Sequence, residues 1–290
     1  MRKGFYLLRD LGIILAAVIV MVFVGLGFAR VVKNRSSLQP RSPRPAVLTL
    51  ESTLKSVISK SIKTTEYLTE SPPLDRALDS IAGRLLAELD PLPYEIEILV
   101  LHSPVVNAVN FPGGLIVVYS GLIMELESPE EMAAVLAHEL GHVVNRDSVK
   151  SIMRQMGIAA FFSALGGRGG QVLAQRILRE AANIKYSRSV EQLADDFAFE
   201  LLISAGIDPA HMGKALENMI QNEGNEGFDY MKIFRYIDTH PQMDSRISSA
   251  YERSASADID EMKFDIQWEK VKDSLPEPEM NLINLEDLLR

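Results

Sequence analysis

Hydrophobic residues follow two different spacings along the chain, and the two spacings occupy different regions. Apolar side chains recur every three or four positions from residue 74 to residue 89, directly after two prolines. The spacing predicts an amphipathic helix that begins at the prolines. Residues 94–101 alternate apolar and polar side chains and residues 115–120 are rich in β-branched ones, so both segments are predicted to be strands. The Pro-Gly-Gly sequence at 112–114 marks a turn between them, and a small hairpin-connected sheet is expected.

Beyond residue 128 the helical spacing dominates and strand signals nearly vanish. Further helices are predicted over residues 149–165, 171–183, 188–205, 209–222 and 242–253. The first helix of this region has a complete start signal, because Ser128 is a suitable N-cap, Pro129 fits the first helical position and Glu131 closes a capping box. The pattern predicts an α+β domain that is mainly helical and carries one small β-sheet.

The N-terminal end carries the longest apolar run of the chain. Residues 11–29 contain no charged side chain, and as a helix they would rise about 28 Å, close to the roughly 30 Å hydrocarbon core of a bilayer. We interpret them as one transmembrane helix that precedes the domain. A cleaved signal peptide is the alternative, although its apolar stretch usually has only about 7 to 15 residues. The membrane is therefore an expected partner, through residues 11–29.

Changes in composition divide the chain into four predicted segments. Residues 1–32 form the membrane anchor, and residues 33–73 form a basic linker with several prolines and a polar helix. Residues 74–255 form the folded domain, and residues 256–290 form an acidic tail. Basic side chains flank the apolar run on both sides, so the positive-inside rule favours a cytoplasmic domain only weakly.

The distribution of charge and the absence of cysteine exclude several classes of function. The net charge is -9, yet eleven of the 30 Lys and Arg residues lie within the first 63 positions, so the remainder is strongly acidic. An acidic body would repel phosphates, which argues against nucleic acid as a partner. Without cysteine, disulfides and thiolate chemistry are excluded, and histidine or carboxylate side chains must hold any metal.

Two of the five histidines stand four residues apart, in the sequence AHELGH inside the helix that begins at Ser128. His138 and His142 project from one face of that helix, one turn apart, and can both bind one tetrahedral ion. Glu139 lies beside this face, within reach of a water on the metal, where a general base is needed. The alternative is an ordinary helix that contains the pattern by chance, but the small and apolar neighbours favour a buried metal site.

Two histidines leave a catalytic zinc ion one protein ligand short, which predicts a third donor elsewhere. The extended H-E-x-x-H-x-x-G-x-x-H spacing is absent, so this donor must come from another helix. Glu191 and Asp195 lie one turn apart in YSRSVEQLADDFAFELL, with Glu191 as a candidate ligand and Asp195 as a candidate acceptor for a histidine N–H. Other carboxylates nearby, such as Asp196 and Glu200, have the pattern of a solvated helix face.

Four blocks of the sequence carry a resemblance to a known family. The blocks NAVNFPGGLIVVYSGLI, AAVLAHELGHVVNRD, YSRSVEQLADDFAFELLISAGIDP and THPQMDSRI resemble the zinc metallopeptidase family of HtpX, the type-one CAAX prenyl proteases and the BepA-like envelope peptidases. The resemblance implies a gluzincin-type fold with one zinc ion per chain, in which Glu191 is the third zinc ligand. It also makes His240 and Arg246 candidate catalytic residues, with His240 either a fourth zinc ligand or a group that stabilises the oxyanion.

The resemblance leads us to expect a membrane-anchored zinc endopeptidase. It would hydrolyse misfolded or membrane and envelope proteins with a zinc-activated water and with Glu139 as general base. Only one hydrophobic segment is present, so the compact envelope-type members, with a peptidase domain on the periplasmic side, are a nearer match than the multi-span prenyl proteases. Residues 105–110 are a candidate edge strand for an extended substrate. The alternative is a zinc-binding chaperone or scaffold that is non-catalytic or held shut by His240.

Overall fold

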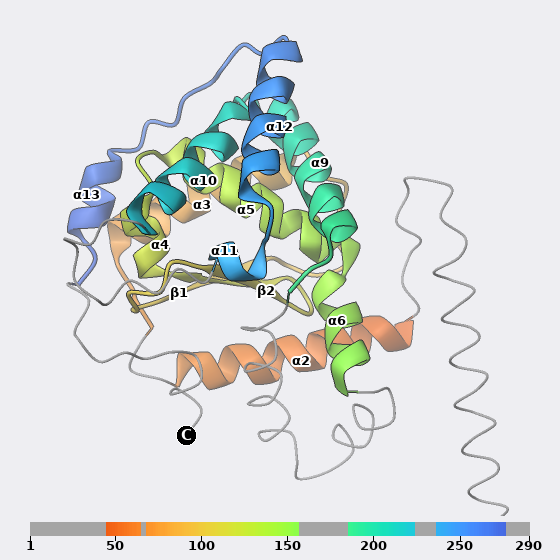
Figure 1. Ribbon diagram of the computed structural model, residues 1–290. Coiled ribbons are helices and arrows are strands. Elements are labelled where there is room, and N and C mark those ends of the chain that lie inside the picture. Colours follow the sequence, from red (N-terminus) through yellow and green to blue (C-terminus); the bar gives the residue numbers. More distant parts are fainter. Residues whose placement is uncertain (1–44, 65–67, 157–184, 224–235, 277–290) are drawn as a thin grey trace, which may run out of the picture. The chain divides into compact units, whose positions relative to one another are not determined.

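The computed structural model describes residues 45–64, 68–156, 185–223 and 236–276, all within the compact unit Pro43–Arg290 (Figure 1). Its helices are α2 (Pro45–Lys63), α3 (Pro72–Ala87), α4 (Ser120–Glu125), α5 (Pro129–Asn145), α6 (Asp147–Met156), α9 (Arg188–Ser204), α10 (Ala210–Glu223), α11 (Tyr236–Thr239), α12 (Met243–Ser256) and α13 (Trp268–Asp273). Its strands are β1 (Glu97–Leu101), β2 (Ala108–Phe111) and β3 (Leu115–Tyr119). The architecture is mainly helical with one small sheet, and this part of the predicted fold class is confirmed.

Two of the predicted helices lie outside the residues that the structure describes. They are the transmembrane span at 11–29 and the helix at 171–183. Within the described ranges, no helix is both long enough and apolar enough to cross a bilayer.

The sheet has the strand order β1-β3-β2, with β1 parallel to β3 and β2 antiparallel to β3. The strands predicted at residues 94–101 and 115–120 therefore lie side by side, but no hairpin joins them, and that part of the prediction was wrong. The candidate edge strand at residues 105–110 overlaps β2, which lies at one end of the strand order. The segment between them contains β2, which carries the chain back so that β3 can run in the same direction as β1. The hairpin connects β2 with β3 through Gly113 and Gly114, whose φ angles of 79° and 80° favour glycine.

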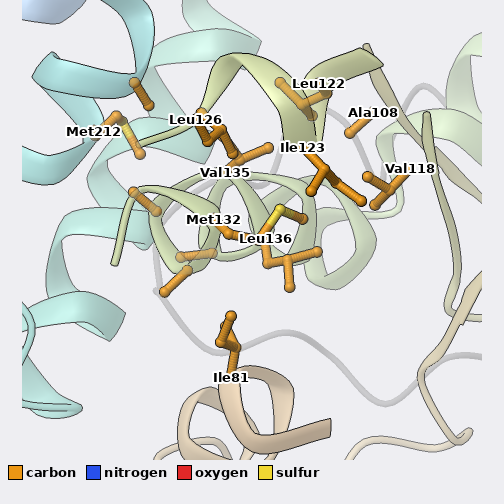
Figure 2. Close-up of a cluster of buried hydrophobic side chains, with 14 of the residues drawn as sticks. Ile81, Ala108, Val118, Leu122, Ile123, Leu126, Met132, Val135, Leu136 and Met212 are labelled. Carbon is orange, nitrogen blue, oxygen red and sulfur yellow. The ribbon is translucent and has the colours of Figure 1, made fainter. Parts of the chain in front are cut away.

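The two faces of the sheet are buried against different helices, and Figure 1 shows α2 and α5 on opposite sides of it. One face points Val100 and Val118 into the main core, which also contains apolar side chains of α3, α4 and α5 (Figure 2). The alternate positions, including Leu99 and Val117, pack with Ile58 of α2 in a second core. Burial of both faces explains why the β3 sequence is continuously apolar instead of alternating.

Helix α5 packs against α3, α9, α10 and β2. Ser128 Oγ accepts a hydrogen bond from the Glu131 amide at 3.2 Å, which caps the helix as predicted, although the Glu131 carboxylate accepts from the amide of Glu127. Gly141 allows α9 to approach closely, since a β-carbon at this position would lie 3.0 Å from the Ala194 carbonyl oxygen. The two helices that carry the predicted site are therefore held close together.

The residues that follow α12 return to the main core and close it beside α3 and α4. Phe264 and Trp268 are buried there, and Trp268 Nε1 donates to the Leu126 carbonyl at 2.8 Å. The Phe264 amide donates to Glu130 Oε1 at 2.9 Å. The segment that the sequence analysis treats as an acidic tail thus contributes side chains to the core of the domain.

Candidate metal centre

Three elements bring four potential metal ligands together. His138 and His142 come from α5, Glu191 comes from the first turn of α9, and His240 directly follows α11. One donor atom from each of these residues lies within 4.8 Å of the others, and all four side chains are buried. The structure therefore groups the three predicted ligands with His240, which the sequence analysis treated as an optional fourth.

Hydrogen bonds fix which nitrogen of each α5 histidine faces the cluster. His138 Nδ1 lies 2.8 Å from Asp195 Oδ1, and His142 Nδ1 lies 3.2 Å from Asp147 Oδ2. A carboxylate can only accept, so each Nδ1 carries a proton and each Nε2 faces the cluster. The two Nε2 atoms are 3.1 Å apart. At this distance the two nitrogens can share one cation, either a proton or a metal ion.

The spacing of the four donor atoms fits a tetrahedral zinc ion. Zinc–nitrogen bonds of about 2.0–2.1 Å place neighbouring ligand atoms about 3.3 Å apart. His240 Nδ1 lies 3.2 Å from His138 Nε2 and 3.1 Å from Glu191 Oε1. His142 Nε2 lies 3.4 Å from Glu191 Oε1. Three imidazoles and one carboxylate form a donor set that suits zinc, so the residues present fit the predicted cofactor.

The electrostatics of the cluster also favour a cation. Burial would lower the pKa of His142, but its contacts with Asp147 and Glu191 outweigh burial and raise the pKa to about 9. Burial would raise the pKa of Glu191, yet the neighbouring histidines hold it well below its usual range. His138 shows the opposite shift, because burial and the Arg246 guanidinium lower its pKa to about 4. The His138 ring is therefore neutral and able to bind a metal.

Arg246 of α12 is buried and forms a two-pronged ion pair with Asp195. Its Nε donates to Oδ2 and its Nη2 donates to Oδ1, both at 2.8 Å. Nη2 also lies 3.1 Å from His138 Nδ1, but a guanidinium can only donate, so the imidazole proton still points to Asp195. Burial would raise the pKa of Asp195, whereas Arg246 lowers it to about 2. Nη1 lies 3.3 Å from Glu191 Oε2, so Arg246 contacts both Asp195 and Glu191 of α9.

The two carboxylate oxygens of Glu139 lie in different environments. Oε2 accepts a hydrogen bond from Asn110 Nδ2 of β2 at 2.9 Å. Oε1 lies 3.6 Å from His240 Nε2, and none of the described residues forms a hydrogen bond with it. The whole side chain is buried. The oxygen that remains available for a proton is therefore the one on the side of His240.

Further side chains contact this centre and were not identified from the sequence, among them Asp147, Asn110 and Tyr186. Asp147 binds His142, Asn110 binds Glu139, and Tyr186 stacks on His142 with ring centroids 4.2 Å apart. Asp147 offered a usable signal, because a carboxylate five residues after a candidate ligand and just past its helix can turn back to the ring. Asn110 and Tyr186 offered none, since their contacts depend on how distant segments pack on α5.

Comparisons with known proteins agree with this geometry. The family model described as Peptidase family M48 matches residues 70–254. The chain is 32% identical over 174 residues to the mitochondrial metalloendopeptidase OMA1 of Arabidopsis thaliana, which covers 57% of this chain and 33% of that protein. It is 26% identical over 207 residues to the beta-barrel assembly-enhancing protease of Yersinia pestis, with coverage of 67% and 42%. It is 29% identical over 199 residues to the metalloprotease YcaL of Escherichia coli (strain K12), with coverage of 66% and 74%.

The extent of these matches defines what they show. The chain spans less than half the length of the Arabidopsis and Yersinia relatives. The family model, in contrast, extends from just before α3 into the last turn of α12, so it includes every residue of the metal centre. The chain belongs to peptidase family M48.

Proposed function

We propose that the chain is a zinc-dependent endopeptidase with a gluzincin-type fold. Its peptidase domain extends from residue 74 beyond the predicted limit at residue 255, since Phe264 and Trp268 lie in its core. The observation that carries this proposal is the buried cluster of donor atoms from His138, His142, Glu191 and His240, with an available oxygen of Glu139 3.6 Å from His240 Nε2. His138, His142 and Glu191 are the proposed ligands. Zinc, when bound, lowers the pKa of a coordinated water to about 7 and polarises the peptide carbonyl.

Glu139 is the proposed general base. Its Oε1 atom takes a proton from the attacking water and later passes it to the leaving amine nitrogen. Burial of Glu139 shields this proton from bulk solvent. Asp195 and Asp147 keep the two histidine rings in the tautomer that can bind the metal.

His240 and Arg246 have supporting roles in this proposal. His240 Nδ1 lies among the donor atoms, where it completes a four-ligand set and leaves no position for substrate. When His240 turns away, that position opens and the imidazole can stabilise the oxyanion. Arg246 acts by holding Asp195 and Glu191. The arrangement of His240 also favours a second candidate function, a latched zinc protein that serves as a chaperone or scaffold.

We propose that extended segments of unfolded or misfolded proteins pair with β2, the strand at one end of the sheet order. The Asn107 carbonyl accepts from the Tyr119 amide of β3. Because hydrogen-bonding directions alternate in an antiparallel pair, Ala108 and Asn110 direct their backbone groups away from β3. Main-chain pairing does not depend on particular side chains and suits substrates of many sequences. N-methylation of single substrate amides next to the scissile bond should raise KM; unchanged KM at every position would remove β2 from the proposal.

We further propose a single-pass membrane protein whose peptidase domain lies on the periplasmic or envelope side. The uncharged run at residues 11–29 supports the anchor. The name of one relative, the beta-barrel assembly-enhancing protease, supports a role in quality control of envelope proteins. Protease treatment of intact spheroplasts tests the side, since digestion of the domain agrees with this placement and full protection would put the domain in the cytoplasm.

The activity itself is tested by cleavage of casein with the full chain in detergent, at equal zinc content for every variant. Glu139→Gln is expected to cut at least about 100-fold more slowly than the wild type. Equal cleavage by both proteins would point to a contaminant or another site and would reject the proposal. If the wild type does not cleave casein, cleavage by His240→Ala identifies a latched enzyme. Absence of cleavage by all three proteins favours the non-catalytic scaffold.

A further inference from the structure

A buried asparagine outside the predicted site contacts the proposed general base. Asn110 lies on β2, where it pairs with Ile116 of β3, and only 2% of the residue is exposed. Its Nδ2 donates to Glu139 Oε2 at 2.9 Å and lies 3.5 Å from the hydroxyl oxygen of Tyr186. The side-chain amide nitrogen carries two hydrogens, so Asn110 can donate to Glu139 Oε2 and to the Tyr186 hydroxyl at the same time.

This contact decides which oxygen of Glu139 faces His240. A glutamate side chain has several rotatable bonds, and α5 fixes only the start of it. With Oε2 held by Asn110, Oε1 stays 3.6 Å from His240 Nε2. Hydrogen bonds to buried carboxylates are among the stronger ones in proteins, so removal of the donor would leave Glu139 both poorly solvated and free to rotate.

We propose that Asn110 is a positioning residue for the reaction: its amide holds one oxygen of Glu139 so that the other stays where the proton is taken. The inference rests on the proposed peptidase function, because it concerns the base of that reaction. A strand suits this task, since the flanking Val109 and Phe111 are both paired with β3 and give the amide a fixed place.

A second asparagine–glutamate hydrogen bond in the chain serves as a control for the Asn110–Glu139 bond. It distinguishes a role in positioning Glu139 from a role in stability alone. Asn218 Nδ2 donates to Glu131 Oε2 at 3.1 Å, near the start of α5. This is also a bond from an asparagine amide to a buried glutamate, but Glu131 lies two helical turns before His138. Removal of the Asn218 contact should affect stability alone, whereas removal of the Asn110 contact should affect the chemical step.

The experiment measures kcat and KM for a casein-derived peptide with the full chain, at equal zinc content. Asn110→Leu keeps a similar volume but cannot donate, and we expect kcat to fall about 10- to 100-fold with KM changed less than about twofold. Asn218→Leu should leave both constants within about twofold. In a Glu139→Asp background, whose shorter side chain does not reach the amide, Asn110→Leu should lower kcat by less than about threefold.

A second measurement is independent of activity. For the zinc-free protein in urea, the cycle of Asn110→Leu and Glu139→Ala should show a coupling of about tenfold in the unfolding equilibrium constant. An additive cycle, or an unchanged kcat in Asn110→Leu while Glu139→Gln is inactive, overturns this inference and leaves the peptidase proposal intact. Equal cleavage by wild type and Glu139→Gln overturns the peptidase proposal and this inference with it.

Discussion

The metal centre and the Glu51–Arg146 contact both bury an acid beside an arginine, yet the two acids respond in opposite ways. Asp195 receives two guanidinium hydrogen bonds and a histidine N–H, and its pKa falls to about 2 despite burial. Glu51 of α2 is just as buried, but only its Oε1 lies near Arg146 Nε, at 3.2 Å. Its Oε2 has no hydrogen-bond partner in the described part of the chain. Burial therefore dominates there and raises the pKa of Glu51, although Arg146 opposes the shift.

The difference teaches that the number and direction of donors decide whether a buried acid stays charged. Arg246 is itself buried and aligns two nitrogens with the two oxygens of Asp195. The Arg146 side chain is 20% exposed and offers Glu51 one nitrogen. A site that binds a metal needs charged acids at neutral pH, so a full set of donors is a functional requirement there. The contact between α2 and the end of α5 has no such requirement.

The largest effect is expected from Asp195→Asn, which removes the charge that Arg246 and His138 share. The buried guanidinium loses its ion pair, so the free energy of unfolding should fall by about 3 kcal/mol or more. His138 loses its orienting acceptor, so zinc affinity should fall about 10- to 100-fold. Urea unfolding and chelator competition measure these quantities. The control is Asp196→Asn, because the neighbouring Asp196 side chain is 52% exposed, and equal losses in both variants would contradict the comparison.

The same variant should show a characteristic pH dependence. The pKa of Asp195 is about 2 in the folded protein against an ordinary value of 3.8, so its charge stabilises the fold above pH 3.8. This stabilisation is lost as the pH falls through about 2. The stability difference between wild type and Asp195→Asn should therefore be constant at neutral pH and shrink between about pH 4 and pH 2. A difference that persists in full at low pH would show that the charge is not its cause.

A smaller effect is expected from Asp147→Asn. Asp147 binds His142 Nδ1, and its other charged contact is Lys150, whose side chain is 41% exposed. Zinc affinity should fall about tenfold, and the free energy of unfolding of the zinc-free protein should fall as well at about pH 6, because burial would lower the pKa of His142 and the contact with Asp147 helps to raise it. Lys150→Met removes the ion pair but keeps the histidine contact, so it should leave zinc affinity unchanged. An equal loss of affinity in Lys150→Met would assign the effect to the ion pair.

A modest gain in stability is expected from Glu51→Gln. The folded pKa of Glu51 is raised above 4.5, so wild-type Glu51 stabilises the fold most below pH 4.5 and loses this contribution as the pH rises through the folded value. The glutamine variant does not titrate. At neutral pH its free energy of unfolding should exceed that of the wild type by about 1 kcal/mol and its Tm should be higher, and both differences should disappear in acid. Glu95→Gln is the exposed control. A lower Tm at neutral pH would mean that the ion pair with Arg146 outweighs burial.

The smallest effect is expected at Glu97 of β1, an acid that is neither fully buried nor fully solvated. Burial would raise the pKa of Glu97, but Lys63 at 2.7 Å and Ser59 at 2.8 Å lower it. Lys63→Met should cost about 0.5 kcal/mol at pH 7 and less in high salt, and the cost should vanish as the pH falls through the lowered pKa of Glu97. Thermal unfolding at two salt concentrations measures the effect, with the exposed Lys60→Met as control. A cost that is insensitive to salt would indicate packing.

Features that depend on local spacing could be predicted from the sequence. The cap at Ser128 and the one-turn separation of His138 and His142 follow from helix start signals and periodicity, and the helix that carries them begins where the pattern indicated. Glu191 was a weaker inference from spacing, since any carboxylate on a helix face is a candidate. The resemblance of the surrounding block distinguished it from its neighbours.

Features that depend on packing between distant segments could not be predicted. The parallel pairing of β1 with β3 requires the intervening segment to form β2. Residues 105–110 were a candidate edge strand, but their pattern does not reveal the order in which the strands pair. No periodicity relates Asn110 to Glu139, or Arg246 to Asp195, because each pair joins two elements whose relative position is set by the core. These contacts decide proton positions and charge states, so the finer chemistry of the site lay beyond sequence patterns.

The residues of the metal centre are far apart in the sequence, so they are synthesised at different times. His138 precedes Arg246 by 108 residues. A ribosome that adds about 5–20 residues per second needs roughly 5 to 20 s to cover this distance. During that interval the histidine pair has been made, but Arg246, which holds Asp195 and Glu191, has not. The contacts that fix these two carboxylates are therefore completed only after α12 has been synthesised.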